Sequence, residues 1–217
     1  SHELRTPVST IRGYAETLLE GALEDKAHAR EFLRIIYDDA ERLSKLINDL
    51  LDLSRIESGK MKLALEECSL ETVVDKVLTG MDKEARKNSV TLKKEIPARL
   101  AKIRIDEAAI AQVLFNLVEN AVKYNNAGGS VTISARETDR GVEVSVADTG
   151  IGIPSEDIPR IFERFYRVDK ARSRDLGGTG LGLSIVKHII QAHRGDITAE
   201  SKVGSGSSFR FTLPKTG

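Results

Sequence analysis

The chain opens with two stretches in which apolar residues recur at helical spacing. In the first, Val8, Ile11 and Leu18 follow one another at such intervals until a glycine and a run of polar residues end the pattern. The second stretch keeps the three/four alternation of a heptad seam, interrupted only at Asp39. The seam residues are Phe32, Ile36, Leu43, Leu46, Leu50 and Leu53. The pattern predicts two long helices joined by a short turn.

A second apolar stripe lies beside this seam. Its residues are Leu33, Ile35, Ile47, Leu51 and Ile56. A single hairpin cannot cover both stripes, so we expect two copies of the chain to form a four-helix bundle. The alternative is that the hairpin packs only on the rest of its own chain.

Beyond the helix-breaking residues 57–60 the pattern changes to alternating strands and helices. It predicts helices at 70–87, 107–124 and 181–193, and strands at 90–95, 102–105, 130–137, 141–148, 196–202 and 207–213. Strands paired as hairpins with helices between them indicate an α+β sandwich. We therefore expect an α+β protein with two domains, the helical hairpin at 1–60 and the sandwich at 61–217.

Composition narrows the class of protein. The 33 basic and 33 acidic residues balance, so no global field attracts the chain to nucleic acid or to an anionic membrane. Cys68 is the only cysteine, which excludes an internal disulfide and a thiolate metal cage. No apolar run approaches the roughly 20 residues that a membrane-spanning helix needs. The helical pattern begins abruptly at the first residues, which predicts a fragment of a longer protein.

Three polar residues share one face of the helix predicted at 107–124. Asn116, Asn120 and Lys123 are spaced by four and three positions. Amide oxygens and a lysine on one face suit a hydrated Mg²⁺ and phosphates, because Mg²⁺ prefers oxygen ligands and keeps several waters. The alternative is an ordinary solvated helix face.

Two glycine-containing segments add to this chemistry. Asp148 ends a predicted strand beside Gly150 and Gly152, where a carboxylate can accept a hydrogen bond from an amine such as that of adenine. The segment 176–183 is glycine-rich and leads into a helix, so its N–H groups and the helix N-terminus favour phosphate. It lacks the Gly-Lys-Ser/Thr ending of a Walker loop and the last glycine of a dinucleotide fingerprint. The first segment, taken alone, is also compatible with a simple turn.

The polar stretch between these two segments predicts a mobile lid. Phe162 and Phe165 would anchor its root, and Arg167 would be available to a phosphate. The alternative is a plain surface loop, which would be unusually long.

His2 is the candidate nucleophile. Glu3 is its neighbour and Thr6 lies one helical turn later, on the same face. Neutral imidazole is a good nucleophile, and a carboxylate beside it can hold its tautomer and accept its proton. The segment is not a zinc-protease motif, because Thr6 stands where the second histidine ligand is required. Pro7 should bend this helix beside the histidine.

Together these segments resemble the bacterial sensor histidine kinases over nearly the whole chain. Five motifs follow in that family's order: an H box at 1–7, an N box at 116–125, a first G box at 148–154, an F box at 162–167 and a second G box at 178–183. The resemblance implies a hairpin for dimerisation and histidine phosphotransfer, joined to an ATP-binding sandwich of the Bergerat (GHKL) type.

The resemblance also implies roles for individual residues. In the hairpin, His2 would be the phosphoacceptor, Glu3 the base that activates it and Thr6 the residue that places water for a phosphatase reaction. In the sandwich, Asn120 would ligate Mg²⁺, supported by Asn116. The other implied ATP-binding residues are Lys123, Tyr124, Asp148, Gly150, Gly152, Ile153, Phe162, Arg167, Gly178, Thr179, Gly180, Leu181, Gly182 and Leu183.

The implied activity is that of an ATP- and Mg²⁺-dependent protein-histidine kinase that phosphorylates His2 and then an aspartate on a response regulator receiver domain. We expect a homodimer formed through the hairpin, no nucleic acid partner, and a cytoplasmic location, with a membrane anchor only in regions preceding this sequence. Two alternatives are an ATPase of the same superfamily and a non-catalytic nucleotide-binding scaffold. The ATPases carry a glutamate where this chain has Asn116. A scaffold would lack the histidine or a glycine box, and neither is missing.

Overall fold

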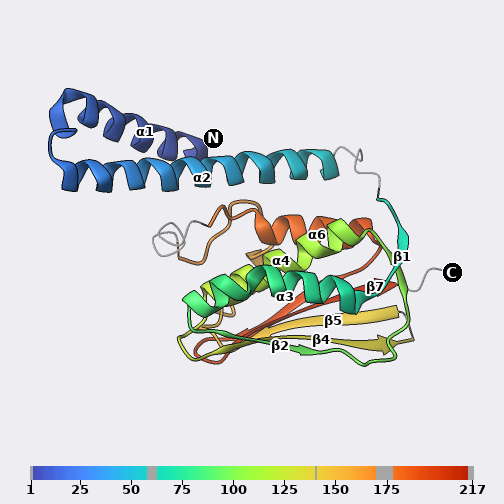
Figure 1. Cartoon of the computed structure of the whole chain (residues 1–217). Coiled ribbons are helices and arrows are strands. Elements are labelled where there is room, and N and C mark those ends of the chain that lie inside the picture. Colours follow the sequence, from blue (N-terminus) through green and yellow to red (C-terminus); the bar gives the residue numbers. More distant parts are fainter. Residues whose placement is uncertain (1, 58–62, 140, 170–177, 215–217) are drawn as a thin grey trace.

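The computed structural model describes residues 2–57, 63–139, 141–169 and 178–214 (Figure 1). The domain boundary predicted near residue 61 and the middle of the predicted lid lie outside the described residues. For His2 only the backbone is described.

The first part of the chain is the predicted helical hairpin. Helix α1 (His2–Thr17) leads through one π-helical turn, η1 (Leu18–Ala22), to the long helix α2 (Lys26–Glu57). The turn contains Gly21 at φ 124°, a conformation that favours glycine. The two helices lie side by side in Figure 1. Near the turn, Tyr14 of α1 packs against Phe32 of α2, with ring centroids 5.1 Å apart.

The second part is a two-layer sandwich. Its five-stranded sheet has the order β2-β4-β5-β7-β6, in which β2 runs parallel to β4 and the other pairs are antiparallel. A separate two-stranded sheet pairs β1 with β3. The strands are β1 (Glu66–Cys68), β2 (Thr91–Glu95), β3 (Ile103–Ile105), β4 (Ser130–Thr138), β5 (Gly141–Asp148), β6 (Ile197–Lys202) and β7 (Gly206–Pro214).

One face of the five-stranded sheet is covered by helices (Figure 1). These helices are α3 (Leu70–Lys87), α4 (Glu107–Lys123) and α6 (Gly182–Ala192), and a short 3₁₀ turn, η2 (Ile158–Arg160), precedes α6 in the chain. Alternate residues of the central strands point to the helices and are buried, as Val144 and Phe211 show. The core therefore lies between the sheet and the helix layer.

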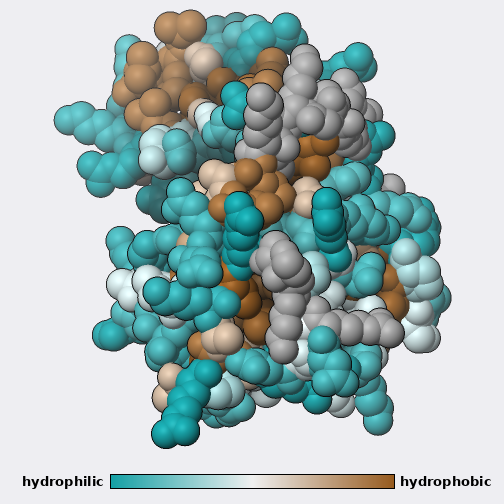
Figure 2. Space-filling model, turned by 90° about the vertical axis from the view of Figure 1, so that its right-hand side faces the viewer, coloured by the Kyte–Doolittle hydropathy of each residue, from teal (hydrophilic) through white to brown (hydrophobic). Residues whose placement is uncertain are grey.

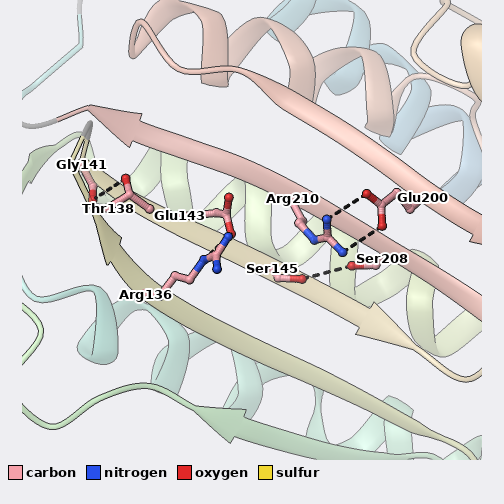
Figure 3. A network of polar contacts seen from close by, with 8 residues as sticks. All are labelled: Arg136, Thr138, Gly141, Glu143, Ser145, Glu200, Ser208 and Arg210. Atoms are coloured by element: carbon pink, nitrogen blue, oxygen red, sulfur yellow. Dashed lines mark hydrogen bonds and ion pairs between the residues drawn. The ribbon is translucent and has the colours of Figure 1, made fainter.

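The other face of the sheet is polar and carries side-chain pairs between neighbouring strands (Figure 3). Arg210 binds Glu200 through two hydrogen bonds of 2.9 Å, and the hydroxyls of Ser145 and Ser208 lie 3.2 Å apart. This alternation of apolar and polar faces explains why the sheet is covered on one side only.

Helix α2 lies across α6 and joins the hairpin to the sandwich (Figure 1). Leu46 and Leu53 of its seam are buried in the same apolar cluster as the core of the sandwich. The alternative that the hairpin packs on its own chain therefore holds for this part of the seam. The second stripe stays open, because Leu33, Ile47 and Leu51 are 53%, 45% and 52% exposed. Apolar side chains gather at the hairpin end of the molecule in Figure 2.

The predicted α+β class, the hairpin and the three helices of the sandwich are confirmed. Two features differ from the prediction. Strand β1 was not predicted, and β2 runs parallel to its neighbour β4 instead of forming a hairpin with another strand. Among the helices that the structure describes, none combines the length and the apolar character that crossing a membrane requires.

Candidate functional site

A cavity of about 190 Å³ opens between α4, α6, the end of β5 and helix α2 of the hairpin. Most of the residues predicted to bind a nucleotide line it. They are Asn116, Asn120, Lys123, Tyr124, Asp148, Gly152, Ile153, Arg167, Gly178, Thr179, Gly180, Gly182 and Leu183. The structure thus brings together segments that are far apart in the sequence.

Helix α4 supplies the polar wall of this cavity. Asp106 caps the helix by accepting a hydrogen bond of 3.0 Å from the Ala109 N–H. One apolar face is buried in the core, which turns Asn116, Asn120 and Lys123 toward the cavity. Burial lowers the pKa of Lys123, because desolvation disfavours its charged form.

Asp148 stands at the end of β5 with one carboxylate oxygen already held. Its Oδ1 accepts hydrogen bonds from the N–H groups of Gly150 at 2.8 Å and Ser207 at 3.3 Å. Burial raises the pKa of Asp148, while these two N–H groups work in the opposite direction. Its orientation is therefore fixed by the backbone, and Oδ2 is left to meet a donor in the cavity.

The glycines after Asp148 are required by close backbone approaches. A Cβ at Gly150 would lie 2.4 Å from the Tyr124 carbonyl oxygen, and Gly150 itself does not line the cavity. Gly152 has φ 71°, and its Cβ would lie 2.1 Å from the carbonyl oxygen of Lys202. The segment is held further by the Ile153 N–H, which donates to Ser201 Oγ at 2.7 Å. These residues position the turn under Asp148.

The second glycine segment leads into α6. Gly180 has φ 73°, and its carbonyl accepts a hydrogen bond of 2.8 Å from the Phe165 N–H. A Cβ at Gly182 would approach Asn116 Oδ1 to 3.2 Å, so this glycine lets the start of α6 lie against the polar face of α4. The N-terminus of α6 and the amides of α4 therefore face the same space.

Two predicted binding residues point into the core instead of the cavity. Leu181 is fully buried. Phe162 packs edge-on against Phe209, with ring centroids 6.4 Å apart, and Phe209 is the one that lines the cavity. Leu181 and Phe162 therefore pack behind the residues that line the cavity and do not line it themselves.

Arg167 is a buried charged group of the site. Only 6% of its side chain is exposed, and its Nη2 binds Glu3 Oε2 at 3.1 Å. Its Nε is buried and has no hydrogen-bond partner among the described residues. A buried guanidinium donor without a partner is costly unless an acceptor joins it, and phosphate oxygens match its geometry.

The residues of the predicted H box begin α1. His2 is its first residue, and the next residue, Glu3, reaches the cavity through Arg167. Thr6 lies one turn later, and its carbonyl accepts a hydrogen bond of 3.1 Å from Thr10 Oγ1. The start of α1 is therefore brought to the edge of the cavity by an ion pair between the two parts of the chain.

Eleven further residues line the cavity and were not predicted as binding residues. They are Lys45, Asp49, Glu119, Ala121, Ile151, Ile161, Tyr166, Val168, Asp169, Ser207 and Phe209. Glu119 lies within the segment 116–125, which the sequence analysis had already connected with nucleotide binding, so its place in that segment could have predicted its position at the cavity. Lys45 and Asp49 belong to α2, and only the docking of the hairpin on the sandwich brings them here.

Comparison with known proteins assigns the chain to a family. Residues 105–217 match the family described as histidine kinase-, DNA gyrase B- and HSP90-like ATPases, and residues 1–59 match the His Kinase A (phospho-acceptor) domain. The chain belongs to the sensor histidine kinases. The first match covers α4, α6 and the end of β5, which form much of the cavity wall.

The chain has curated relatives that are named as sensor kinases. The chain is 44% identical over 216 residues to the sensor histidine kinase WalK of Bacillus subtilis, and 39% identical to the sensor protein kinase WalK of Staphylococcus epidermidis. In both cases the match covers 99% of this chain and 35% of the relative. The chain thus spans about a third of the length of these sensor kinases.

Solved histidine kinases have the same fold. The Acinetobacter baumannii kinase AdeS is 27% identical and matches with a TM-score of 0.82 over 100% of this chain and 99% of its own. The kinase ThkA, solved in complex with the response regulator protein TrrA, is 28% identical and matches with a TM-score of 0.80 over 99% of this chain and 59% of its own. The predicted architecture of a hairpin followed by the sandwich of this family is confirmed.

Proposed function

We propose that the chain is an ATP-dependent protein-histidine kinase that phosphorylates His2 and passes the phosphoryl group to an aspartate of a response regulator. The observation that carries this proposal is the ion pair between Arg167, which lines the cavity, and Glu3, the neighbour of His2. An ATPase or a passive scaffold would have no need of this junction between cavity and hairpin.

Binding of the adenine base is assigned to the end of the cavity formed by Asp148 and Tyr124. The fixed carboxylate of Asp148 offers Oδ2 to an exocyclic amine, since Oδ1 is held by backbone N–H groups. The phosphates would extend toward Lys123, Arg167 and the start of α6, where charge and N–H groups favour anions.

A magnesium ion fits the donors on α4. Asn116 and Asn120 both line the cavity and provide amide oxygens, which suit Mg²⁺ with retained waters. Among the described residues no cluster of three or more His, Cys, Asp or Glu forms a competing metal site. When bound, the ion would neutralise part of the phosphate charge.

Transfer to His2 requires positioning more than covalent chemistry from the protein. Phosphoryl transfer passes through a loose transition state, so groups that hold the donor and acceptor in line provide most of the acceleration. A bond forms between the imidazole nitrogen and the γ-phosphorus, the bond to the leaving oxygen of ADP breaks, and Glu3 accepts the imidazole proton. Thr6 would place water for a separate reaction, in which water attacks the aspartyl phosphate of the regulator and releases the free aspartate and inorganic phosphate.

The partners follow from the same assignment. A homodimer through the hairpin would cover the exposed stripe of α2, where Leu33 and Leu51 are about half exposed. A response regulator receiver domain would be the acceptor, as the ThkA complex illustrates for a relative. We place the chain on the cytoplasmic side of a longer, membrane-anchored sensor kinase.

The test is incubation of the chain with γ-labelled ATP and Mg²⁺, beside His2→Ala and Asn120→Ala variants. We expect label on the protein that survives base, is lost in acid and disappears in His2→Ala. Asn120→Ala should lose most of the label, because an amide of the proposed magnesium site is gone. Release of free phosphate without protein label would instead establish an ATPase.

A further inference from the structure

Helix α2 of the hairpin places two charged residues in the wall of the nucleotide cavity. Lys45 and Asp49 are one helical turn apart and both line it. Lys45 Nζ binds both carboxylate oxygens of Glu119 at 2.7 Å, which fixes α2 beside the magnesium face of α4. The hairpin therefore forms part of the cavity in this arrangement.

Asp49 occupies the place in which an anion is favoured. Thr179 Oγ1 donates a hydrogen bond of 2.7 Å to Asp49 Oδ2 and accepts one of 3.3 Å from the Leu181 N–H. Leu181 is the N-cap residue of α6, so the Thr179 hydroxyl links the Asp49 carboxylate to the N-terminus of that helix. The partial positive charge that would attract a phosphate is thus compensated by a carboxylate of the hairpin.

The surroundings make this carboxylate a poor neighbour for phosphate. Burial is the largest cause of the raised pKa of Asp49; the Thr179 hydroxyl and Lys45 lower this pKa, and the nearby carboxylates Glu119 and Asp52 raise it further. A triphosphate would add several negative charges to this cluster. The cavity of about 190 Å³ is also smaller than the roughly 300 Å³ at which sites for drug-sized ligands begin, and α2 forms one of its walls.

We propose that Asp49 of the hairpin competes with the terminal phosphates of the nucleotide for the same place, beside Thr179 and the start of α6. When α2 is docked, the Asp49 carboxylate holds Thr179 and the start of α6. When ATP binds, its phosphates displace that carboxylate and separate α2 from the cavity wall. Docking of the hairpin and binding of ATP therefore oppose each other, and the opposition increases with the number of phosphates. This inference rests on the proposed nucleotide site.

Asp49→Asn tests the charge while keeping an oxygen that can accept from Thr179. Affinities for a non-hydrolysable ATP analogue, ADP and AMP, each with Mg²⁺, are measured by calorimetric titration. We expect Asp49→Asn to bind the triphosphate about fivefold more tightly, ADP about twofold more tightly and AMP unchanged, because each phosphate adds repulsion. The gain should shrink as salt rises.

The matched control is Asp38→Asn on the same helix, where the carboxylate is exposed and pairs with Arg34. It should leave all three affinities unchanged. Equal tightening for all three nucleotides, or none, with Asp49→Asn overturns the proposal. Absence of binding of any nucleotide by the unaltered chain would instead overturn the proposed function. A thermal unfolding scan without nucleotide separates these results from a folding defect.

Discussion

Glycines of this chain divide into those that the backbone requires and those that it tolerates. Gly150 belongs to the first group, because a side chain there would meet the Tyr124 carbonyl and the Asp148 carboxylate. Gly80 belongs to the second group, since it lies in the middle of α3 on its solvent-exposed side, where a Cβ would meet nothing within 4 Å. The two positions allow the cost of a methyl group to be compared within one domain.

We expect Gly150→Ala to destabilise the protein by about 1–3 kcal/mol, the range of overpacking, and to weaken nucleotide binding by moving Asp148. Gly80→Ala should stabilise it by about 0.5–1 kcal/mol, because alanine is the better helix former. Urea unfolding gives both values, and nucleotide titration checks the binding. Equal effects of the two substitutions would contradict the positioning role of Gly150.

Predictability differed among residues of the site for a physical reason. The face of Asn116, Asn120 and Lys123 was predictable, because helical spacing alone determines which side chains share a side. The placement of Phe162 and Leu181 in the core was not, since apolar residues inside a motif can face either the ligand or the interior. Lys45 and Asp49 were missed because only tertiary docking makes them part of the site. The binding roles expected of the other residues remain predictions.

The turn between α1 and α2 is closed by one ionic pair. Asp25 accepts hydrogen bonds from the N–H groups of Ala27 and His28 at the start of α2, and its Oδ2 lies 2.6 Å from His28 Nδ1. This side-chain hydrogen bond is the largest cause of both shifts, lowering the pKa of Asp25 below 3.8 and raising that of His28 above 6.5. The pair is therefore strongest when both groups are charged.

The pH dependence of the hairpin follows from these directions. The contribution of His28 is complete below pH 6.5 and is lost as pH rises through the raised pKa. That of Asp25 is complete above pH 3.8 and is lost as pH falls through the lowered pKa. We expect His28→Ala to lower the urea midpoint at about pH 5.5 and to have a smaller effect at about pH 9. An equal effect at both pH values would exclude the ionic contribution.

Helices were easier to predict than strand partners. The predicted bounds of α3, 70–87, are those observed, because its apolar face repeats over several turns. Strand β1 has only three residues, too few for an alternation to be recognised. The parallel pairing of β2 with β4 could not be predicted, since periodicity shows that a segment is a strand but not which strand lies beside it.

At the scale of the molecule, α2 serves two surfaces at once. Leu53 is 2% exposed and packs into the core shared with the sandwich, whereas Leu51, two residues earlier, is 52% exposed. The first residue would hold the two parts of one chain together, and the second would face another copy of the hairpin in the proposed dimer.

Substituting these two leucines separates the surfaces. Leu53→Ala should cost about 2–5 kcal/mol as a buried leucine and speed amide hydrogen exchange in α6, against which α2 packs. Leu51→Ala should leave α6 exchange unchanged and weaken the dimer, measured by sedimentation. Unchanged α6 exchange in Leu53→Ala would show that docking does not depend on this contact.

Among the strands that the structure describes, β2 and β6 are the two edges of the five-stranded sheet. An open edge offers unpaired N–H and carbonyl groups on which a foreign strand can form, and this is a route to aggregation. Here β2 exposes Lys93, Lys94 and Glu95, and β6 exposes Glu200 and Lys202. Charges on both edges disfavour such strand addition, and with it the growth of the sheet into fibrils.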